Sequence, residues 1–387
     1  MIAYNKKWLA NLIVRAETIS ALEAQCISQP ENDSVFAAYP AAFYSPNRFV
    51  RIGLFILTFI IVVFSLGLFS LLFISGGDEE VIGSLILFFG LLIYGGLELI
   101  VKKRHYRSGV DDALLWMTGA SIASGLNIIS NVSWQTNALI IFILAVFLFL
   151  RFINTLMAGI ACVAALAIVY LGVIRLGETA RVLAPFVVML AAAGIYWFVQ
   201  KLRTKEYARY YSNGLVVASV VTLVCFYLAG NYYMVMEAQA YRLSAFSKDR
   251  ATLSFGWVYW ILTLAIPIIY LARGLQKKDL VLLRVGLLLV ACTALTLHYY
   301  YHIMPAETIL VIIGILLIAL AYSLIKYLHE PRHGFTHKET GDPSFMDRLQ
   351  VESLVIVETL GGQRAQANAG TQFGGGTGEG GGASGGF

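Results

Sequence analysis

Long apolar runs separated by short polar connections are the feature that most limits what this chain can fold into. Between Ile52 and Leu328, ten runs come near the length that an α-helix needs to cross about 30 Å of hydrocarbon. They fall approximately at 52–74, 81–101, 110–130, 136–152, 154–174, 180–200, 213–233, 254–273, 280–302 and 306–328. Because backbone polar groups in lipid must hydrogen-bond within their own segment, such runs predict helices. We therefore expect an all-α, polytopic transmembrane bundle of about ten spanning helices.

The composition agrees with this architecture. Hydrophobic residues make up 58% of the chain and charged residues only 13%, about half the charged share of an ordinary soluble domain. So few charges cannot cover a water-facing surface of this size. A soluble enzyme, a disordered chain and a nucleic-acid binder are excluded, and the lipid bilayer is the expected main partner.

The distribution of positive charge predicts the orientation of the bundle. Ten crossings place both termini on one side of the membrane, and that side receives 23 of the 28 Lys and Arg residues. Cytoplasmic loops carry an excess of Lys and Arg. We therefore predict that the N and C termini are both cytoplasmic.

Four regions are expected along the chain. Residues 1–51 are a cytosolic N-terminal region, and 52–328 are the transmembrane bundle. Residues 329–369 are a cytosolic C-terminal segment, and 370–387, with ten glycines in eighteen residues, are a flexible tail.

Residues 6–27 show apolar side chains at helical spacing and are expected to form an amphipathic helix. Three placements remain open for this helix: on the membrane surface, on a partner protein, or folded against the cytosolic ends of the bundle.

The estimated midplane of the bundle lacks ionisable residues. Its positions hold small or hydroxyl side chains such as Ser121 and Thr222. Ion-coupled carriers normally need at least one charged group there, so the pattern argues against them. A pore or a carrier for a neutral molecule stays open. The chain contains no Ser-His-Asp pairing, HExxH, Walker loop or GxSxG motif, so we name no catalytic residue and expect no cofactor.

Three features of the spans are candidates for a substrate or cavity site. Asp111 and Asp112 stand at the start of the 110–130 run, where carboxylates also suit the positive end of a helix dipole. That run contains Ser121 within a face of small residues, which permits close packing and marks an expected central helix. Pro267 interrupts the 254–273 run and should remove one backbone hydrogen bond there.

The segment from His298 to His302 (HYYYH) has the most unusual composition in the spans. His298 and His302 share a helix face at i and i+4, and with Glu307 they are candidate metal ligands. The other interpretation is an aromatic belt, in which tyrosine and histidine side chains place polar tips among the lipid headgroups. Tyr299 and Tyr300 are also further candidates for a substrate or cavity site.

The tail from Phe373 to Phe387, which ends GGGASGGF, resembles the glycine-rich, aromatic-terminated tails of uncharacterised bacterial polytopic inner-membrane proteins. The layout of an amphipathic N-terminal helix, the segment FYSPNRF at 43–49 and a glycine tail is also similar to theirs. This resemblance implies a location in the bacterial inner membrane and carries no assigned activity.

Three hypotheses follow. The first, which we favour, is a non-catalytic membrane protein that anchors or organises partner proteins through its cytosolic termini. The second is a channel or carrier for a neutral or lipid-like substrate. The third is a membrane-embedded enzyme or metal site that uses Asp111 and Asp112 or the pair His298 and His302. The sequence does not determine the oligomeric state.

Overall fold

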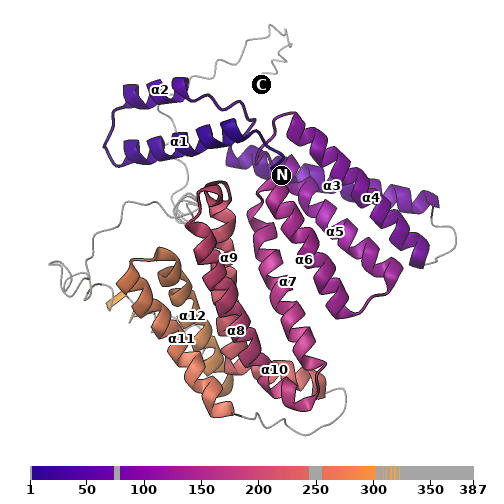
Figure 1. Cartoon of the computed structure of the whole chain (residues 1–387), viewed down its shortest axis with the longest axis vertical. Helices are drawn as coiled ribbons and strands as arrows, with labels where there is room; N and C mark the ends of the chain where they lie inside the picture. The colour runs from indigo at the N-terminus through magenta and orange to yellow at the C-terminus, as the bar shows by residue number, and fades with distance from the viewer. Residues whose placement is uncertain are drawn as a thin grey trace, which may run out of the picture. The chain divides into compact units, whose positions relative to one another are not determined.

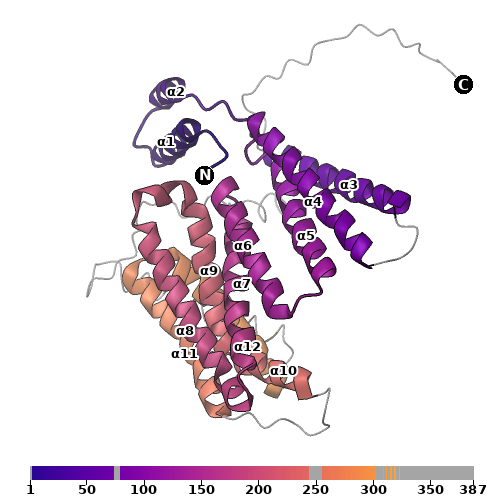
Figure 2. The same ribbon diagram turned by 45° about the vertical axis from the view of Figure 1, so that its right-hand side comes forward.

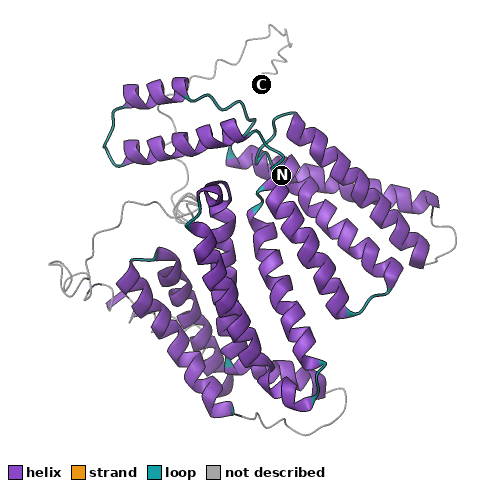
Figure 3. Cartoon of the chain, viewed as in Figure 1, coloured by secondary structure: helices purple, strands orange, loops and turns teal. Residues whose placement is uncertain are grey.

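The computed structural model describes residues 2–73, 79–243 and 255–301, together with the helical positions 308, 311, 314–315, 318–319 and 322. All of them belong to one unit that extends over residues 1–342. They form twelve α-helices and one short 3₁₀ helix, and no strand occurs in these described parts (Figure 3). The prediction of an all-α chain is confirmed.

Nine of the described helices are long and apolar enough to cross a membrane. They are α3 (Arg48–Phe73), α4 (Glu79–Lys102), α5 (Val110–Ser130), α6 (Trp134–Phe152), α7 (Thr155–Ile174), α8 (Glu178–Arg203), α9 (Ser212–Gly230), α11 (Gly256–Lys277) and α12 (Leu280–Tyr301) (Figure 1). They match the first nine predicted spans, whereas most of the tenth, 306–328, lies outside the described residues. The chain is an integral, multi-pass membrane protein.

Five of the described spans, α3, α4, α6, α8 and α11, are longer than predicted. Helix α3 begins at Arg48 and α8 continues to Arg203, beyond the apolar runs that define them. Basic side chains can extend toward water while their helical backbone remains at the interface, so a helix need not end where its apolar run ends. The apolar run therefore underestimates the helix.

The remaining elements lie outside the spans. Helices α1 (Lys6–Glu23) and α2 (Gln29–Ala38) run side by side as a hairpin at one end of the bundle (Figures 1 and 2). The Asn5 side chain caps α1, and a capping box of Ser28 and Glu31 begins α2. The 3₁₀ helix η1 (Glu206–Tyr211) connects α8 to α9, and α10 (Tyr232–Leu243) follows α9.

Helix α9 is at the centre of the contacts between helices. It contacts α7, α8, α10, α11 and α12, and half of its span is buried. Helix α5, which we expected to be central, contacts α3, α4 and α6. Its small residues serve one close interface with α4, whereas small and β-branched residues occur all around α9. Helix α3 is peripheral, with 6% of its span buried.

Candidate functional site

The connection between α4 and α5, residues 103–109, is packed against the start of α3. Gly109 has a φ of +93°, and a β-carbon at this position would collide with the backbone carbonyl oxygen of Arg51. Glycine alone meets both demands, because it adopts positive φ readily and has no side chain. The close approach brings the first turn of α5, with Asp111 and Asp112, beside Arg51.

Asp111 is buried, with 3% of its surface exposed. Its carboxylate accepts hydrogen bonds from the backbone N–H groups of Arg107 (2.7 Å) and Ser108 (2.8 Å) and from the Ser108 hydroxyl (3.0 Å). These donors precede α5, so the carboxylate holds the 103–109 connection instead of capping the helix. The saturation of its oxygens supports a structural role.

Asp112 joins three helices. Its carboxylate forms an ion pair with the Arg51 guanidinium of α3 at 2.5 Å. It also accepts a hydrogen bond of 3.0 Å from the side-chain amide of Asn154, the N-cap residue of α7. A partly buried ion pair is sensitive to the loss of one partner, because the other charge is then left uncompensated. Asp112 therefore links the starts of α3, α5 and α7.

A second ion pair joins α4 to α6. The guanidinium of Arg151 contacts both carboxylate oxygens of Glu98, at 2.6 and 3.0 Å, and the Tyr94 hydroxyl donates to the same carboxylate at 2.9 Å. The backbone carbonyl of Arg151 accepts from the N–H of Ala3 at 2.9 Å. The first residues of the chain are thus bonded to the transmembrane bundle.

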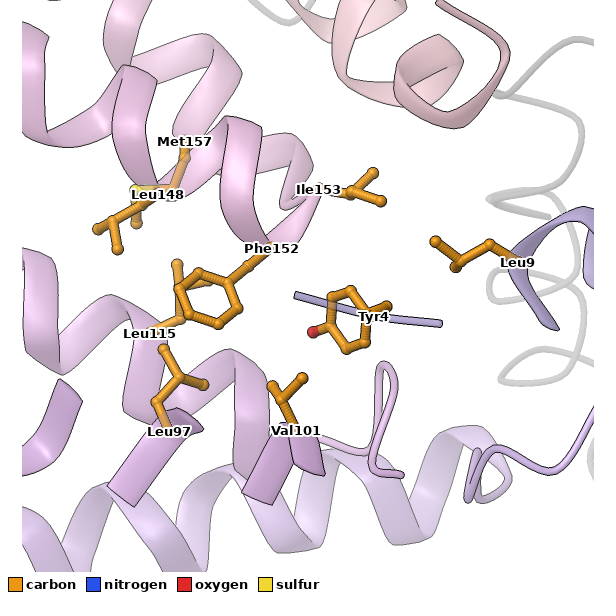
Figure 4. Packing of buried hydrophobic residues seen from close by; sticks show 9 residues of the cluster. All are labelled: Tyr4, Leu9, Leu97, Val101, Leu115, Leu148, Phe152, Ile153 and Met157. Atoms are coloured by element: carbon orange, nitrogen blue, oxygen red, sulfur yellow. The ribbon is translucent and has the colours of Figure 1, made fainter. Parts of the chain in front are cut away.

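Tyr4 packs the N-terminal region against the bundle (Figure 4). Only 7% of it is exposed, and its ring meets the edges of Tyr106 (5.0 Å) and Phe152 (6.5 Å). Removal from water, and then the nearby Asp111 carboxylate, raise the pKa of the Tyr4 phenol well above its usual value of 10.0. We call this group the Tyr4 cluster. Its buried members are Tyr4, Leu9, Leu97, Val101, Leu115, Leu148, Phe152, Ile153 and Met157.

Polar contacts close the hairpin and tie it to η1. The Arg15 guanidinium donates to the backbone carbonyls of Tyr39 (2.7 Å) and Phe36 (2.8 Å). The Glu17 carboxylate pairs with Arg209 of η1 at 3.0 Å. Of the three placements open for residues 6–27, docking on the end of the bundle is the one observed. We call this end, where α1 lies and where α3, α5 and α7 begin, the N-terminal end.

Ser121 lies in the interface between α4 and α5. It is buried, and a β-carbon on Gly90 would come within 3.0 Å of the Ser121 β-carbon. A β-carbon on Gly125 would be only 2.7 Å from the backbone nitrogen of Leu87. The small residues thus serve close helix packing, as in other membrane interfaces. Ser121 occupies packed interior at this point.

Pro267 lies inside α11 and removes the usual hydrogen-bond donor to the carbonyl of Thr263. The Thr293 hydroxyl of α12 lies 3.1 Å from that carbonyl oxygen and donates to it. The same hydroxyl is 2.9 Å from the Leu289 carbonyl, which already has its helical donor. The Thr263 carbonyl has no helical donor, and an unsatisfied backbone group is costly in lipid. We therefore assign the hydrogen bond of the Thr293 hydroxyl to the Thr263 carbonyl. Thr293 therefore compensates for the proline.

A buried polar network extends from Thr293 to the end of α9. The Tyr227 hydroxyl is 2.9 Å from the Thr293 hydroxyl and accepts from the Asn231 amide at 2.9 Å. The same amide donates to the Thr296 hydroxyl at 3.1 Å, and the Asn231 oxygen accepts from the N–H of Met234 in α10. We call Tyr227, Asn231, Thr293 and Thr296 the Asn231 network. It joins α9, α10 and α12.

Tyr299 and Tyr300 contact the aromatic start of α10. The Tyr300 ring lies 5.0 Å from Tyr232 and 5.7 Å from Trp260, and the Tyr299 ring lies 4.8 Å from Tyr233. These edge-to-face contacts hold α10 against α11 and α12.

The three metal candidates are only partly described. His298 is in α12, whereas His302 and Glu307 lie outside the described residues. In the parts of the chain that the structure describes, no group of three His, Cys, Asp or Glu side chains is placed to hold a metal.

Sequence reasoning missed several residues that form these sites. Tyr4, Arg51 and Asn154 carry no local signal, because their partners are distant in sequence. Asn231 had a signal: it is an amide directly after Gly230, at the end of an apolar run. A polar side chain at this position indicates a buried partner or a helix cap.

No protein-family model, curated protein or solved structure matches this chain. Its function is therefore inferred from its own residues and their geometry.

Proposed function

We propose that this chain is a multi-pass protein of the bacterial inner membrane that holds partner proteins at its N-terminal hairpin, α1–α2. The observation that carries the proposal is the fixed mounting of the hairpin, through the buried Tyr4 and the bond from Ala3 to Arg151. A rigid mounting lowers the entropy lost when a partner binds.

The charge distribution supports a cytoplasmic location for the hairpin. Exposed basic side chains surround the N-terminal end of the bundle, at Lys102, Lys103, Lys201 and Lys205 among others. An excess of Lys and Arg is typical of cytoplasmic loops. The resemblance of the glycine-rich tail to the tails of bacterial inner-membrane proteins supports the proposed location in that membrane.

The surface that α2 and the end of α1 offer to a partner is polar and acidic. Helix α1 contacts the bundle through Leu9, while α2 packs on α1 and leaves Glu31 and Asp33 exposed. Glu23 is exposed at the end of α1. A partner with a basic surface is the complement of these carboxylates.

The carboxylates of α4 and α5 near the hairpin are occupied by ion pairs or hydrogen bonds within the fold, which favours partner holding over catalysis. Glu98 and Asp112 are paired with arginines, and Asp111 is saturated by donors from the 103–109 connection. Each of these groups holds elements of the fold together, and a rigid platform results.

Photocrosslinking in intact membranes tests the proposal. A photoreactive residue is placed at Ser34, on the exposed side of α2, and as a control at Trp257, on the opposite end of the bundle. We expect a discrete adduct from Ser34 alone, reduced about tenfold by the double change Glu23→Lys and Asp33→Lys, which reverses two charges. Equal adducts from both positions, or an adduct insensitive to the charge reversal, would refute partner holding by the hairpin.

A carrier for a neutral substrate is the second candidate. The Asn231 network favours it, because the network places hydroxyl and amide groups within a bundle that contains a proline-interrupted helix. Flux of small neutral solutes into proteoliposomes tests this function. Faster flux than in protein-free liposomes, lowered by Asn231→Ala, is the expected result, and equal flux in both would eliminate the carrier.

A further inference from the structure

Five basic side chains at the N-terminal end are exposed and lie on two neighbouring elements. Two are at the start of α1 and three at the end of α4 and just beyond it. They are Lys6, Lys7, Lys102, Lys103 and Arg104, which we call the basic patch. Within the described residues none of them forms an ion pair.

An aromatic contact brings the two parts of the patch together. The guanidinium of Arg104 lies 5.0 Å from the centre of the Trp8 ring, directly after Lys7 in α1. The Arg104 backbone is left-handed (φ +69°), which ends α4 there, and its carbonyl accepts from the N–H of Tyr44. Trp8 also meets the ring of Phe43 at 5.3 Å. Aromatic side chains of this kind are typical of the membrane–water interface.

The acidic residues nearest to the basic patch are engaged elsewhere. Glu98 pairs with Arg151, and Asp112 pairs with Arg51. Asp111 accepts three hydrogen bonds from the 103–109 connection. The patch therefore keeps a positive potential that an external anion can satisfy.

The patch continues an apolar, outward-facing stripe of α4. Leu99 is 60% exposed and lies one helical turn before Lys102 and Lys103, on the same face. Further along the stripe, Leu92 is exposed, and Gly95 stands between Leu92 and Leu99. A β-carbon on Gly95 would meet nothing within 4 Å, so open space exists beside the helix here. The basic patch suits the anionic headgroup of a phospholipid, and the adjoining apolar stripe suits its acyl chain.

We propose that the basic patch binds the phosphate-bearing headgroup of an anionic phospholipid, with an acyl chain along Leu99, Gly95 and Leu92 of α4. The lysines and Arg104 supply charge and donors for the phosphate. The site goes beyond the proposed partner holding and does not depend on it. A free phosphate ion would use the patch but not the apolar stripe, and a second copy of the chain would use the stripe but not the charges.

Native mass spectrometry of the purified full chain in detergent tests the site. The probes are phosphatidylglycerol, phosphatidylcholine of the same acyl chains, and inorganic phosphate. The test variant is Lys102→Gln with Lys103→Gln, and the matched control is Lys201→Gln with Lys205→Gln, which removes the same charge at the same end. We expect phosphatidylglycerol to bind the wild type best and to bind the test variant roughly 25-fold more weakly, at about fivefold for each lysine. The control variant should bind like the wild type.

A second variant addresses the acyl chain. Gly95→Leu fills the open space on α4 without changing charge, and it should lower the affinity for long-chain phosphatidylglycerol more than that for a short-chain analogue. Thermal melting of each variant confirms that it is folded. Equal binding of the two lipids, equal loss in the control variant, or full competition by millimolar inorganic phosphate would overturn the proposal. So would a dimer that Gly95→Leu abolishes while lipid binding is unchanged.

Discussion

Replacement of Thr293 by valine is the sharpest test of how this bundle accommodates Pro267. Valine has nearly the shape of threonine but lacks the hydroxyl, so Thr293→Val removes hydrogen bonds and leaves the packing almost unchanged. Two groups lose their partner: the Thr263 carbonyl, 3.1 Å away, and the Tyr227 hydroxyl, 2.9 Å away. Both are buried within the bundle.

The expected loss follows from these two bonds. Hydrogen bonds between membrane helices contribute about 0.6 kcal/mol on average and up to about 1.7 kcal/mol. A buried group left without a partner costs about 1–3 kcal/mol. Since the Thr263 carbonyl has no backbone donor, it lies toward the costly end. We expect Thr293→Val to lower the free energy of unfolding by about 2 kcal/mol.

Unfolding in mixed micelles of increasing denaturing-detergent fraction measures this loss, with Thr222→Val as the matched control. Thr222 is fully buried in α9, and its hydroxyl donates only to carbonyls of its own helix, at 2.8 and 3.0 Å. These carbonyls keep their backbone donors, so the control should lose no more than about 0.6 kcal/mol. Equal losses in the two variants would refute the compensation.

A double-mutant cycle with Pro267→Ala isolates the interaction between the Thr293 hydroxyl and the Thr263 carbonyl. Alanine restores an N–H that can donate to the Thr263 carbonyl, so the Thr293 hydroxyl becomes partly redundant. Thr293→Val should then cost about 1 kcal/mol less than it does beside proline. Strict additivity of the two changes would show that the carbonyl does not depend on Thr293.

Three further predictions concern the N-terminal end. Gly109→Ala should destabilise the protein by at least about 2 kcal/mol, because it combines positive φ with a steric collision. Gly53→Ala, where a β-carbon meets nothing within 4 Å, should be neutral or stabilising in the same unfolding assay; similar losses at both sites would contradict this reason. The raised pKa of Tyr4 means that its burial stabilises the hairpin fully below pH 10 and progressively less as the pH rises above it. Hydrogen exchange of α1 between pH 9 and 11 should therefore accelerate beyond its intrinsic rate in the wild type but not in Tyr4→Phe, and identical profiles would exclude Tyr4 as the cause. The backbone N–H and then the hydroxyl of Ser28 lower the pKa of Glu31 below 4.5, so its capping contribution is present above that pH and is lost as the pH falls through the lowered value. Acid should release amide protection in α2 of the wild type, whereas Glu31→Gln should lack this acid-dependent step; an unchanged step would show that another group controls α2.

The spans could be predicted because their signal is local. Enough apolar residues in a row specify a helix across the membrane whatever it packs against, so nine spans were placed correctly. Which spans are central in the bundle and which are peripheral could not be predicted in this way. Small residues mark close packing both in α5 and in α9, and nothing within either run shows how many neighbours will use it.

The candidate residues show the same contrast between local signals, which the sequence reveals, and distant partners, which it does not. Asp111 and Asp112 were recognisable from their position before an apolar run, but their roles depend on partners elsewhere. Arg51 is 61 residues from Asp112, and Tyr4 is 107 residues from Asp111. Pro267 predicted a missing hydrogen bond, whereas its compensation by α12 required the fold. The pattern identified the residues that need a partner and could not name the partner.

The Asn231 network has a consequence for the synthesis of the protein. Asn231 ends α9, but Thr296, which accepts from its amide, is 65 residues further along the chain. At roughly 5–20 residues per second, the ribosome needs about 3–13 s to make that stretch. During this time the Asn231 amide can donate to Tyr227 of its own helix, but its second acceptor, in α12, has not been made. The Asn231 network can therefore be completed only after α12 has been inserted, and a truncation before α12 should leave α9 accessible to the quality-control proteases of the membrane.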